Sequence, residues 1–165
     1  MLYPFAFLSE QHHQTAFWIL VAAVLLIGFV LNIVGAPLVT NAAPAGIISY
    51  ELAGDIANAQ GILASWDTNA RLRAAFVQGF DFLFIPVYVA AIGIDCGISA
   101  KQIRKKLWPL ASLGTILAWA IILVGIFDII ENIALAIMLL DQAAAPLPQI
   151  AFWCAALKFV IIILG

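Results

Sequence analysis

The stretch FDIIENIAL, residues 127–135, places three polar side chains inside an otherwise apolar run. On a helix, Asp128, Glu131 and Asn132 occupy positions i, i+3 and i+4, so all three project from one face. If the run crosses a membrane, each ionised carboxylate costs at least about 2.5 to 3.5 kcal/mol. Two carboxylates on one helical turn therefore need partners, protons or a cation, and this need predicts a polar site between helices.

The composition of the chain is that of an integral membrane protein. Of the 165 residues, 65% are hydrophobic and only 10% are charged, and the mean hydropathy is +1.12. These values lie outside the usual range of soluble domains. Four apolar runs are long enough to span a bilayer as helices; they cover residues 16–36, 74–99, 107–140 and 150–165. Because no strand-like alternation recurs, we predict an all-α membrane protein, a single domain with four transmembrane helices.

Basic residues predict the orientation of these helices. Four of them crowd the short connection between the second and third runs: Lys101, Arg104, Lys105 and Lys106. The other two connections hold only Arg71 and Arg73. Since basic residues collect on the cytoplasmic side, we expect this connection and both termini to be cytoplasmic. No Lys or Arg precedes the first run, which favours a true span over a cleaved signal peptide.

The long connection between the first two runs contains a further periodic segment, residues 46–66. Its apolar side chains recur every three or four residues, as on one face of a helix: Ile48, Leu52, Ile56, Ala59, Leu63 and Trp66. The segment has no Lys or Arg that would hold it on anionic lipid. We therefore predict one amphipathic helix on the outer surface, packed across the mouth of the bundle or against a partner. A simple connector is the alternative.

Polar residues from all four runs are predicted to meet. At about 1.5 Å per helical residue, the distances from the outer ends of the runs place a polar group of every run in the outer half of the membrane. Tyr88 lies two turns beyond Asp81 on the second run and Asn132 is next to Glu131 on the third. The candidate site residues are Asn32, Asp81, Tyr88, Asp128, Glu131, Asn132 and Lys158.

The charges of this set do not balance. Asp81, Asp128 and Glu131 face one cation, Lys158. Three ways to restore the balance are open: an arginine from the outer connection, protonated carboxyl groups, or a bound cation.

Four interpretations follow from this imbalance. The residues could form a structural cluster that fixes helix register, or a pocket for an amphiphilic or partner-derived group under the outer helix. They could also form a divalent-metal site with Asp81, Asp128 and Glu131 as ligands, although interior histidine is absent. A proton relay is the fourth, but the inner half supplies only Asp95 at its edge.

Three motifs occur in order between residues 47 and 140: ILASW at 62–66, DFLFIPVY at 81–88 and FDIIENIAL at 127–135. Together, as ILxxW, DFLFxPxY and FDxxENxxL, they resemble a broad group of small, uncharacterised bacterial integral membrane proteins with four predicted helices. The resemblance implies a location in the bacterial inner membrane. It also implies that Asp81, Asp128, Glu131 and Asn132 belong to the pattern of the group, and it implies no activity.

We therefore expect a non-enzymatic membrane protein, an accessory or structural subunit of a larger membrane complex. Its polar site would hold the bundle together and receive a lipid-like ligand, without a cofactor. The expected partners are membrane lipids and other membrane protein subunits, and a net charge of −2 gives no reason to expect nucleic acid. The alternative is a divalent-metal-dependent membrane enzyme that acts on a lipid or isoprenoid substrate.

Overall fold

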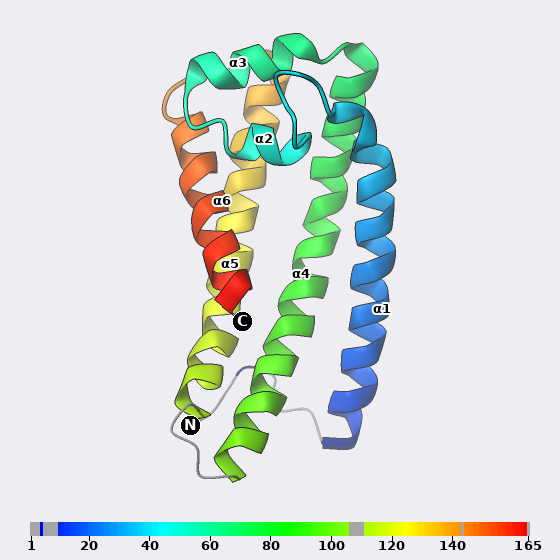
Figure 1. Cartoon of the computed structure of the whole chain (residues 1–165), viewed down its shortest axis with the longest axis vertical. Coiled ribbons are helices and arrows are strands. Elements are labelled where there is room, and N and C mark those ends of the chain that lie inside the picture. Colours follow the sequence, from blue (N-terminus) through cyan, green and yellow to red (C-terminus); the bar gives the residue numbers. More distant parts are fainter. Residues whose placement is uncertain (1–3, 5–9, 106–110, 143, 165) are drawn as a thin grey trace.

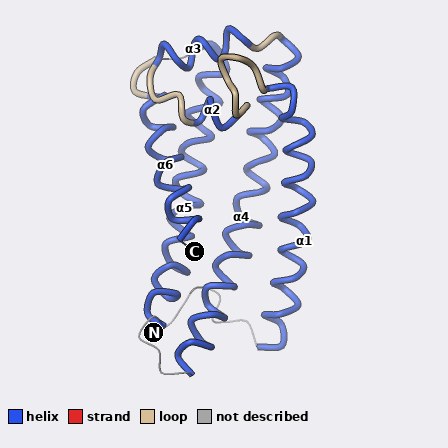
Figure 2. The backbone as a smooth tube through the Cα atoms, viewed as in Figure 1, coloured by secondary structure: helices blue, strands red, loops and turns tan. Residues whose placement is uncertain are grey.

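The computed structural model describes residues 4, 10–105, 111–142 and 144–164, which form helices and connecting loops (Figure 2). Four long helices each contain a stretch that is long and apolar enough to cross a membrane. They are α1 (Glu10–Gly35), α4 (Thr68–Lys105), α5 (Ala111–Ile137) and α6 (Leu147–Leu164). The prediction of an all-α protein with four membrane-spanning helices is confirmed. By helix length and hydropathy, this is a multi-pass integral membrane protein.

The helices extend beyond the predicted apolar runs. Helix α1 begins six residues before residue 16, and α4 extends past both ends of the 74–99 run. The backbone hydrogen bonds of the helix continue through the polar residues at these ends, although such residues are unfavourable in the hydrocarbon of a membrane. Helix α5 continues as one π-helical segment, η2 (Met138–Gln142), and α6 begins three residues before Ile150 with Pro148 in its first turn. The predicted start of the third helix at residue 107 lies outside the described residues.

The long helices run side by side, and two short helices lie across one end of them (Figure 1). Helix α1 packs against α4, α4 against α5, and α5 against α6. The 3-10 helix η1 (Ala36–Leu38) leads from α1 to the short helices α2 (Ile47–Glu51) and α3 (Ile56–Ser65). We call the end that carries α2 and α3 the capped end.

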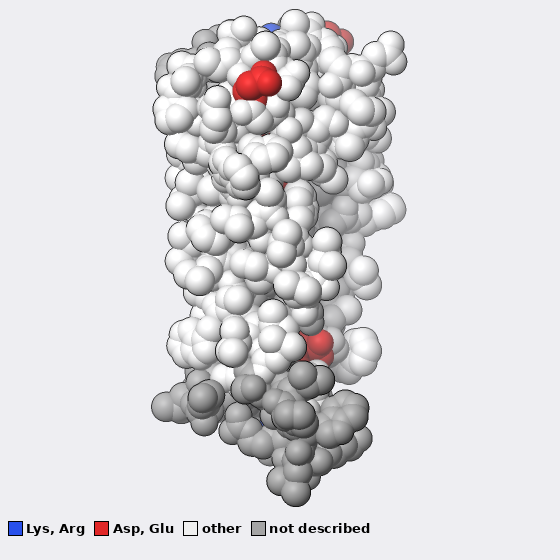
Figure 3. Space-filling model, turned by 60° about the vertical axis from the view of Figure 1, so that its left-hand side comes forward, with Lys and Arg blue, Asp and Glu red and all other residues white. Residues whose placement is uncertain are grey.

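Apolar side chains cover most of the surface between the two ends. Figure 3 shows one face that is free of charged atoms over most of its length, with acidic atoms near the capped end and again near the opposite end. Large apolar residues are exposed along this length of the helices, for example Trp18, Phe29, Leu83, Trp119 and Trp153. Lipid tails are the surroundings that such a surface requires.

The predicted amphipathic helix over residues 46–66 is divided in the structure. Helix α2 ends at Glu51, and Gly54, three residues later, has a positive φ of 74°, a conformation that favours glycine and that does not continue a helix. Asp55 then caps α3, because its carboxylate accepts a hydrogen bond of 2.8 Å from the backbone N–H of Asn58. The prediction of a single helix is therefore wrong.

The division changes which side chains are buried. Ile48 and Leu52, which were predicted for the apolar face, are 43% and 38% exposed, whereas Tyr50 is completely buried. The Tyr50 hydroxyl donates to the backbone carbonyl of Leu135 in α5 at 3.2 Å. Its ring lies edge-on to Trp66, with centroids 5.3 Å apart. Helix α2 is thus packed into the capped end of the bundle, where it contacts α5 and α6.

Two apolar cores hold the bundle on either side of the polar residues. The core at the capped end includes Leu38, Tyr50, Leu63, Trp66, Leu135 and Met138. A second core, in the middle of the bundle, is formed by Ile85, Tyr88, Ile121 and Val124. The candidate site lies between these two cores.

Candidate functional site

Lys158 of α6 is at the centre of a group of buried acidic side chains. Its Nζ lies 2.7 Å from Asp128 Oδ1 and 3.0 Å from each carboxylate oxygen of Glu131. A third carboxylate follows at 3.6 Å, that of Glu51 in α2. Asp128 and Glu131 are 2% and 0% exposed, so these contacts are shielded from solvent. Short charge-assisted hydrogen bonds of this kind are about twice as strong as neutral ones.

Two further hydrogen bonds connect α5 to α4. The Tyr88 hydroxyl donates to Asp128 Oδ2 at 2.6 Å, and the Asn132 side-chain amide donates to Asp81 Oδ2 at 2.6 Å. Asp128 therefore accepts from α4 on one oxygen and from α6 on the other. We refer to the connected residues as the polar cluster: Glu51, Asp81, Tyr88, Asp128, Glu131, Asn132 and Lys158.

The spacing in FDIIENIAL explains why this arrangement forms. Asp128, Glu131 and Asn132 share one face of α5, and this helix packs against both α4 and α6. The polar face can therefore reach Asp81 and Tyr88 on one side and Lys158 on the other. The structure brings together six of the seven candidate site residues. The seventh, Asn32 of α1, lines the cavity beside the cluster.

Glu51 is the member of the cluster that the sequence analysis missed. On a single amphipathic helix over residues 46–66, Glu51 falls outside the apolar face and would point to solvent. The signal that could have found it is the Gly54-Asp55 pair, since glycine followed by an N-cap residue marks a helix end and a new start. Burial raises the pKa of the Glu51 carboxyl, and Asp81 raises it further, whereas the Lys158 ammonium opposes both.

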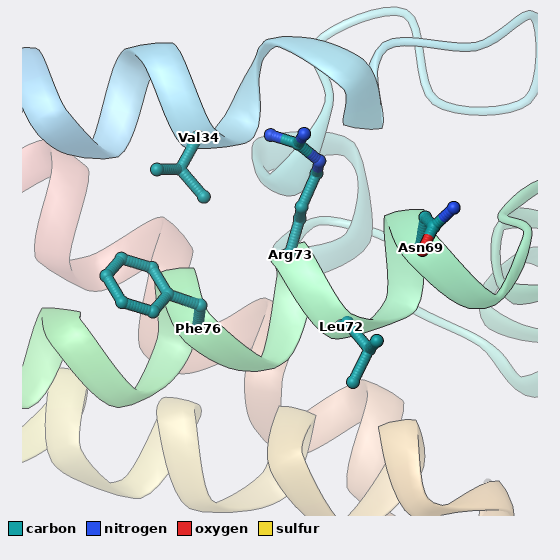
Figure 4. A pocket seen from close by; sticks show the side chains of 5 residues that line it. All are labelled: Val34, Asn69, Leu72, Arg73 and Phe76. Atoms are coloured by element: carbon teal, nitrogen blue, oxygen red, sulfur yellow. The ribbon is translucent and has the colours of Figure 1, made fainter.

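The two arginines that were a possible source of positive charge, Arg71 and Arg73, lie in the first turns of α4 and take other positions. Arg71 Nη2 donates to the backbone carbonyl of Leu63 in α3 at 3.0 Å. Arg73 extends from α4 toward α1 and lines a separate cavity of about 520 Å³ with Val34 and Phe76 (Figure 4). The ion pairs that the structure shows within the cluster are thus made by Lys158. Four carboxyl groups of the cluster face its one ammonium group, an even larger excess than the sequence predicts.

A cavity of about 300 Å³ lies beside the polar cluster, between α1, α2, α4, α5 and α6. We call it the polar cavity. Its walls include six polar side chains: Asn32, Glu51, Gln78, Asp81, Asn132 and Lys158. Leu31, Val77, Phe84 and Phe159 make up part of its apolar wall. Gln78 is a second residue that was not predicted for the site.

A second cavity of about 270 Å³ lies farther along the bundle, between α1, α4 and the end of α6. It is mainly apolar, and its walls include Val21, Val24, Ile92 and Ile162. Tyr88 lines this apolar cavity and also donates to Asp128 of the polar cluster. Helices α1, α4 and α6 contribute to both cavities.

The proposed metal ligands do not surround a free position. Lys158 Nζ contacts both Asp128 and Glu131 at 2.7 to 3.0 Å, so an ammonium group takes the place that a cation would need between them. Asp81 is engaged with Asn132 instead. Within residues 10–105, 111–142 and 144–164, no group of three or more His, Cys, Asp and Glu side chains is arranged to hold a metal ion.

No protein-family model matches this chain, and comparisons with curated proteins and with solved structures likewise give no match. The resemblance carried by the three motifs is therefore supported in one respect, the four long apolar helices of a membrane protein.

Proposed function

We propose that this chain is a non-enzymatic integral membrane protein that binds an amphiphilic, lipid-like molecule in the polar cavity. The observation that carries the proposal is the composition of the cavity wall. Charged and amide side chains from α2, α4, α5 and α6 meet apolar side chains from α1 and α4 around one space of about 300 Å³. This volume is at the lower end of the range for small-molecule sites, roughly 300 to 1,000 Å³. It suits a polar group and the first carbons of an apolar chain.

The apolar cavity supplies the second half of such a site. Helices α1, α4 and α6, which also contribute to the polar cavity, line the apolar cavity. Its residues Val24 and Ile162 offer apolar contacts to a hydrocarbon chain. Along α1 and α4, the polar cavity is followed by the apolar cavity. A molecule with one polar end and one apolar end would match this order. Amphiphiles of this kind are available in every membrane.

The hydrogen bonding of the cluster favours binding over catalysis. Both oxygens of Asp128 accept hydrogen bonds, from Lys158 and from Tyr88, and Asp81 accepts one from Asn132. These groups are occupied in holding one another, whereas a general base must reach a proton of the substrate. The contacts of Lys158 also weigh against the alternative, a divalent-metal-dependent enzyme.

The accessory-subunit role and the location belong to the same proposal. We place the protein in the bacterial inner membrane, with the capped end outside and both termini in the cytoplasm, because of the basic connection between the second and third spans. A polar cavity on that side would hold its ligand close to the outer interface. Partner subunits would contact the apolar faces of the helices.

The experiment is purification in mild detergent, followed by mass spectrometry of all associated lipids, polypeptides and metals. Gly28 lines the polar cavity, and no atom lies within 4 Å of a Cβ added there, so a side chain can start at this position and Gly28→Leu would fill part of the cavity. Gly79→Leu is the matched control, because it adds the same side chain at an exposed position of α4 with equal space. We expect one enriched amphiphile class with the wild-type protein and Gly79→Leu, and its loss with Gly28→Leu.

Four other results would change the proposal. Equal retention of the amphiphile by Gly28→Leu, or no enrichment at all, would refute binding in this cavity. If partner polypeptides accompany the protein at fixed stoichiometry and no amphiphile does, the accessory-subunit role is supported and ligand binding is refuted. A stoichiometric divalent metal that Glu131→Gln removes would support the enzyme.

A further inference from the structure

Gln78 is buried without a partner. Its side chain in α4 is 3% exposed, and neither Nε2 nor Oε1 has a hydrogen-bond partner among the described residues. A buried polar group left in this state has lost its hydrogen bonds to water without replacement, which destabilises the fold. Gln78 lines the polar cavity, so a molecule bound there would be the partner that its amide lacks among the described residues. The residue therefore indicates a ligand that both donates and accepts hydrogen bonds.

The charge around Gln78 indicates whether the polar group of the ligand is anionic or cationic. Glu51 and Asp81 line the same cavity, and Asp128 and Glu131 contact Lys158, which also lines it. Glu51 Oε2 is buried and makes no hydrogen bond among the described residues, at 3.6 Å from Lys158 Nζ. An anionic group such as a phosphate or carboxylate would face these carboxyl groups. A cationic group would reduce the excess of negative charge.

Lys158 is already paired with carboxylates. An ammonium group has three N–H donors; Lys158 donates one hydrogen bond to Asp128 and one to Glu131, and the Glu51 carboxylate lies 3.6 Å from its Nζ. The cavity wall also includes the carboxylates of Glu51 and Asp81, which can only accept hydrogen bonds. A quaternary ammonium would satisfy the charge but could not donate to Gln78 or Glu51, whereas a primary ammonium can do both.

We infer that the polar cavity binds the primary ammonium group of an amphiphilic amine. Gln78 Oε1 and the Glu51 carboxylate accept hydrogen bonds from the ammonium group. Gln78 Nε2 donates to an oxygen of the ligand, such as a hydroxyl or carbonyl group on a neighbouring carbon. The apolar chain extends between α1, α4 and α6 toward the apolar cavity. This inference rests on the proposed function and specifies the chemical class of its ligand.

The test is calorimetric titration of the protein in phosphatidylcholine nanodiscs, with empty nanodiscs subtracted. The probes are octylamine, its trimethylammonium analogue, 1-octanol and octanoate, which differ in charge and in donor groups but share one chain. We expect saturable binding of octylamine, and binding at least about tenfold weaker for the other three, since a hydrogen bond to a charged group contributes about 1.5 to 3 kcal/mol.

Gln78→Leu separates ligand binding from packing. It removes both polar atoms at similar volume, so we expect the variant to fold at least as stably as the wild-type protein and to bind octylamine about tenfold more weakly or worse. Gln60→Leu is the matched control, because Gln60 is exposed on α3, and it should bind as the wild-type protein does. Unchanged octylamine binding by Gln78→Leu would overturn the inference.

Failure of the inference and failure of the proposed function give different results. If octanoate or octanol binds most tightly, and Gly28→Leu abolishes that binding, the cavity binds an amphiphile but not an amine. If no probe binds and no amphiphile accompanies the purified protein, the proposed function itself fails.

Discussion

Replacement of Lys158 by Met removes the ammonium group from the polar cluster and keeps a side chain of similar length. Asp128 loses its 2.7 Å contact, and Glu131 loses two contacts of 3.0 Å. Both carboxyl groups stay buried, at 2% and 0% exposure. Removal of one partner from a buried ion pair costs about 3 to 5 kcal/mol, because an uncompensated charge is left behind. The volume change adds little, so we expect a loss of about 3 to 5 kcal/mol in the free energy of unfolding.

The assay is reversible unfolding by sodium dodecyl sulfate in mixed micelles, followed by circular dichroism. Leu157→Met is the control. It introduces the same residue on the same helix, at a position that is 46% exposed and outside the cluster. A triple variant, Lys158→Met with Asp128→Asn and Glu131→Gln, removes the uncompensated charges together with the ammonium group. We expect it to regain most of the lost stability, because coupled residues do not contribute additively.

Two results would refute this reasoning. If Lys158→Met loses less than about 1 kcal/mol, the ion pairs do not hold the helices together. If the triple variant is no more stable than Lys158→Met, the loss comes from packing and not from the buried charges.

Three further predictions concern neighbouring features. Tyr88→Phe removes the 2.6 Å hydrogen bond to Asp128 and should cost about 1.5 to 3 kcal/mol in the same assay; a loss within 0.5 kcal/mol, roughly the error of such values, would contradict it. Gly114→Ala should cost about 1 to 3 kcal/mol, because its Cβ would lie 3.0 Å from a side-chain carbon of α4, whereas Gly28→Ala, with no atom within 4 Å, should be neutral or stabilising. Equal effects would show that α4 and α5 do not approach closely there. Because burial raises the pKa of Glu51 above 4.5, its contribution to stability is complete below that pH and declines as the pH rises through the raised pKa. Glu51→Gln should flatten this part of the stability profile, and equal slopes for the two proteins would contradict the prediction.

The spacing of residues along one helix was enough to predict most of the polar cluster. Asp128, Glu131 and Asn132 had to project from one face of α5, and their cost in hydrocarbon required partners on other helices. Asp81 and Lys158 were then the available groups at the right depth. Helix periodicity and desolvation are local properties, so they can be read from the sequence.

The cavity and the position of α2 could not be predicted in this way. Helix α1 carries apolar side chains on all sides, so its sequence does not indicate which face contacts α4 and which faces the cavity. The burial of Glu51 depends on a break of four residues, 52–55, which contains Gly54 and Asp55 and shifts the phase of the segment. Small changes of this kind alter which residues meet without changing the composition or the periodicity very much.

The unbalanced cluster also bears on why the site exists. If the cluster only fixed the helix register, one acidic residue for each ammonium group would be enough, and a buried fourth carboxyl group would add cost without benefit. Gln78 likewise lowers stability as long as its amide has no partner. Residues that destabilise a fold in this way are expected where function requires them. On this argument, Glu51→Gln and Gln78→Leu should each stabilise the protein without its ligand and weaken amine binding. If the two variants are more stable but bind the amine as tightly as the wild-type protein, Glu51 and Gln78 do not serve ligand binding.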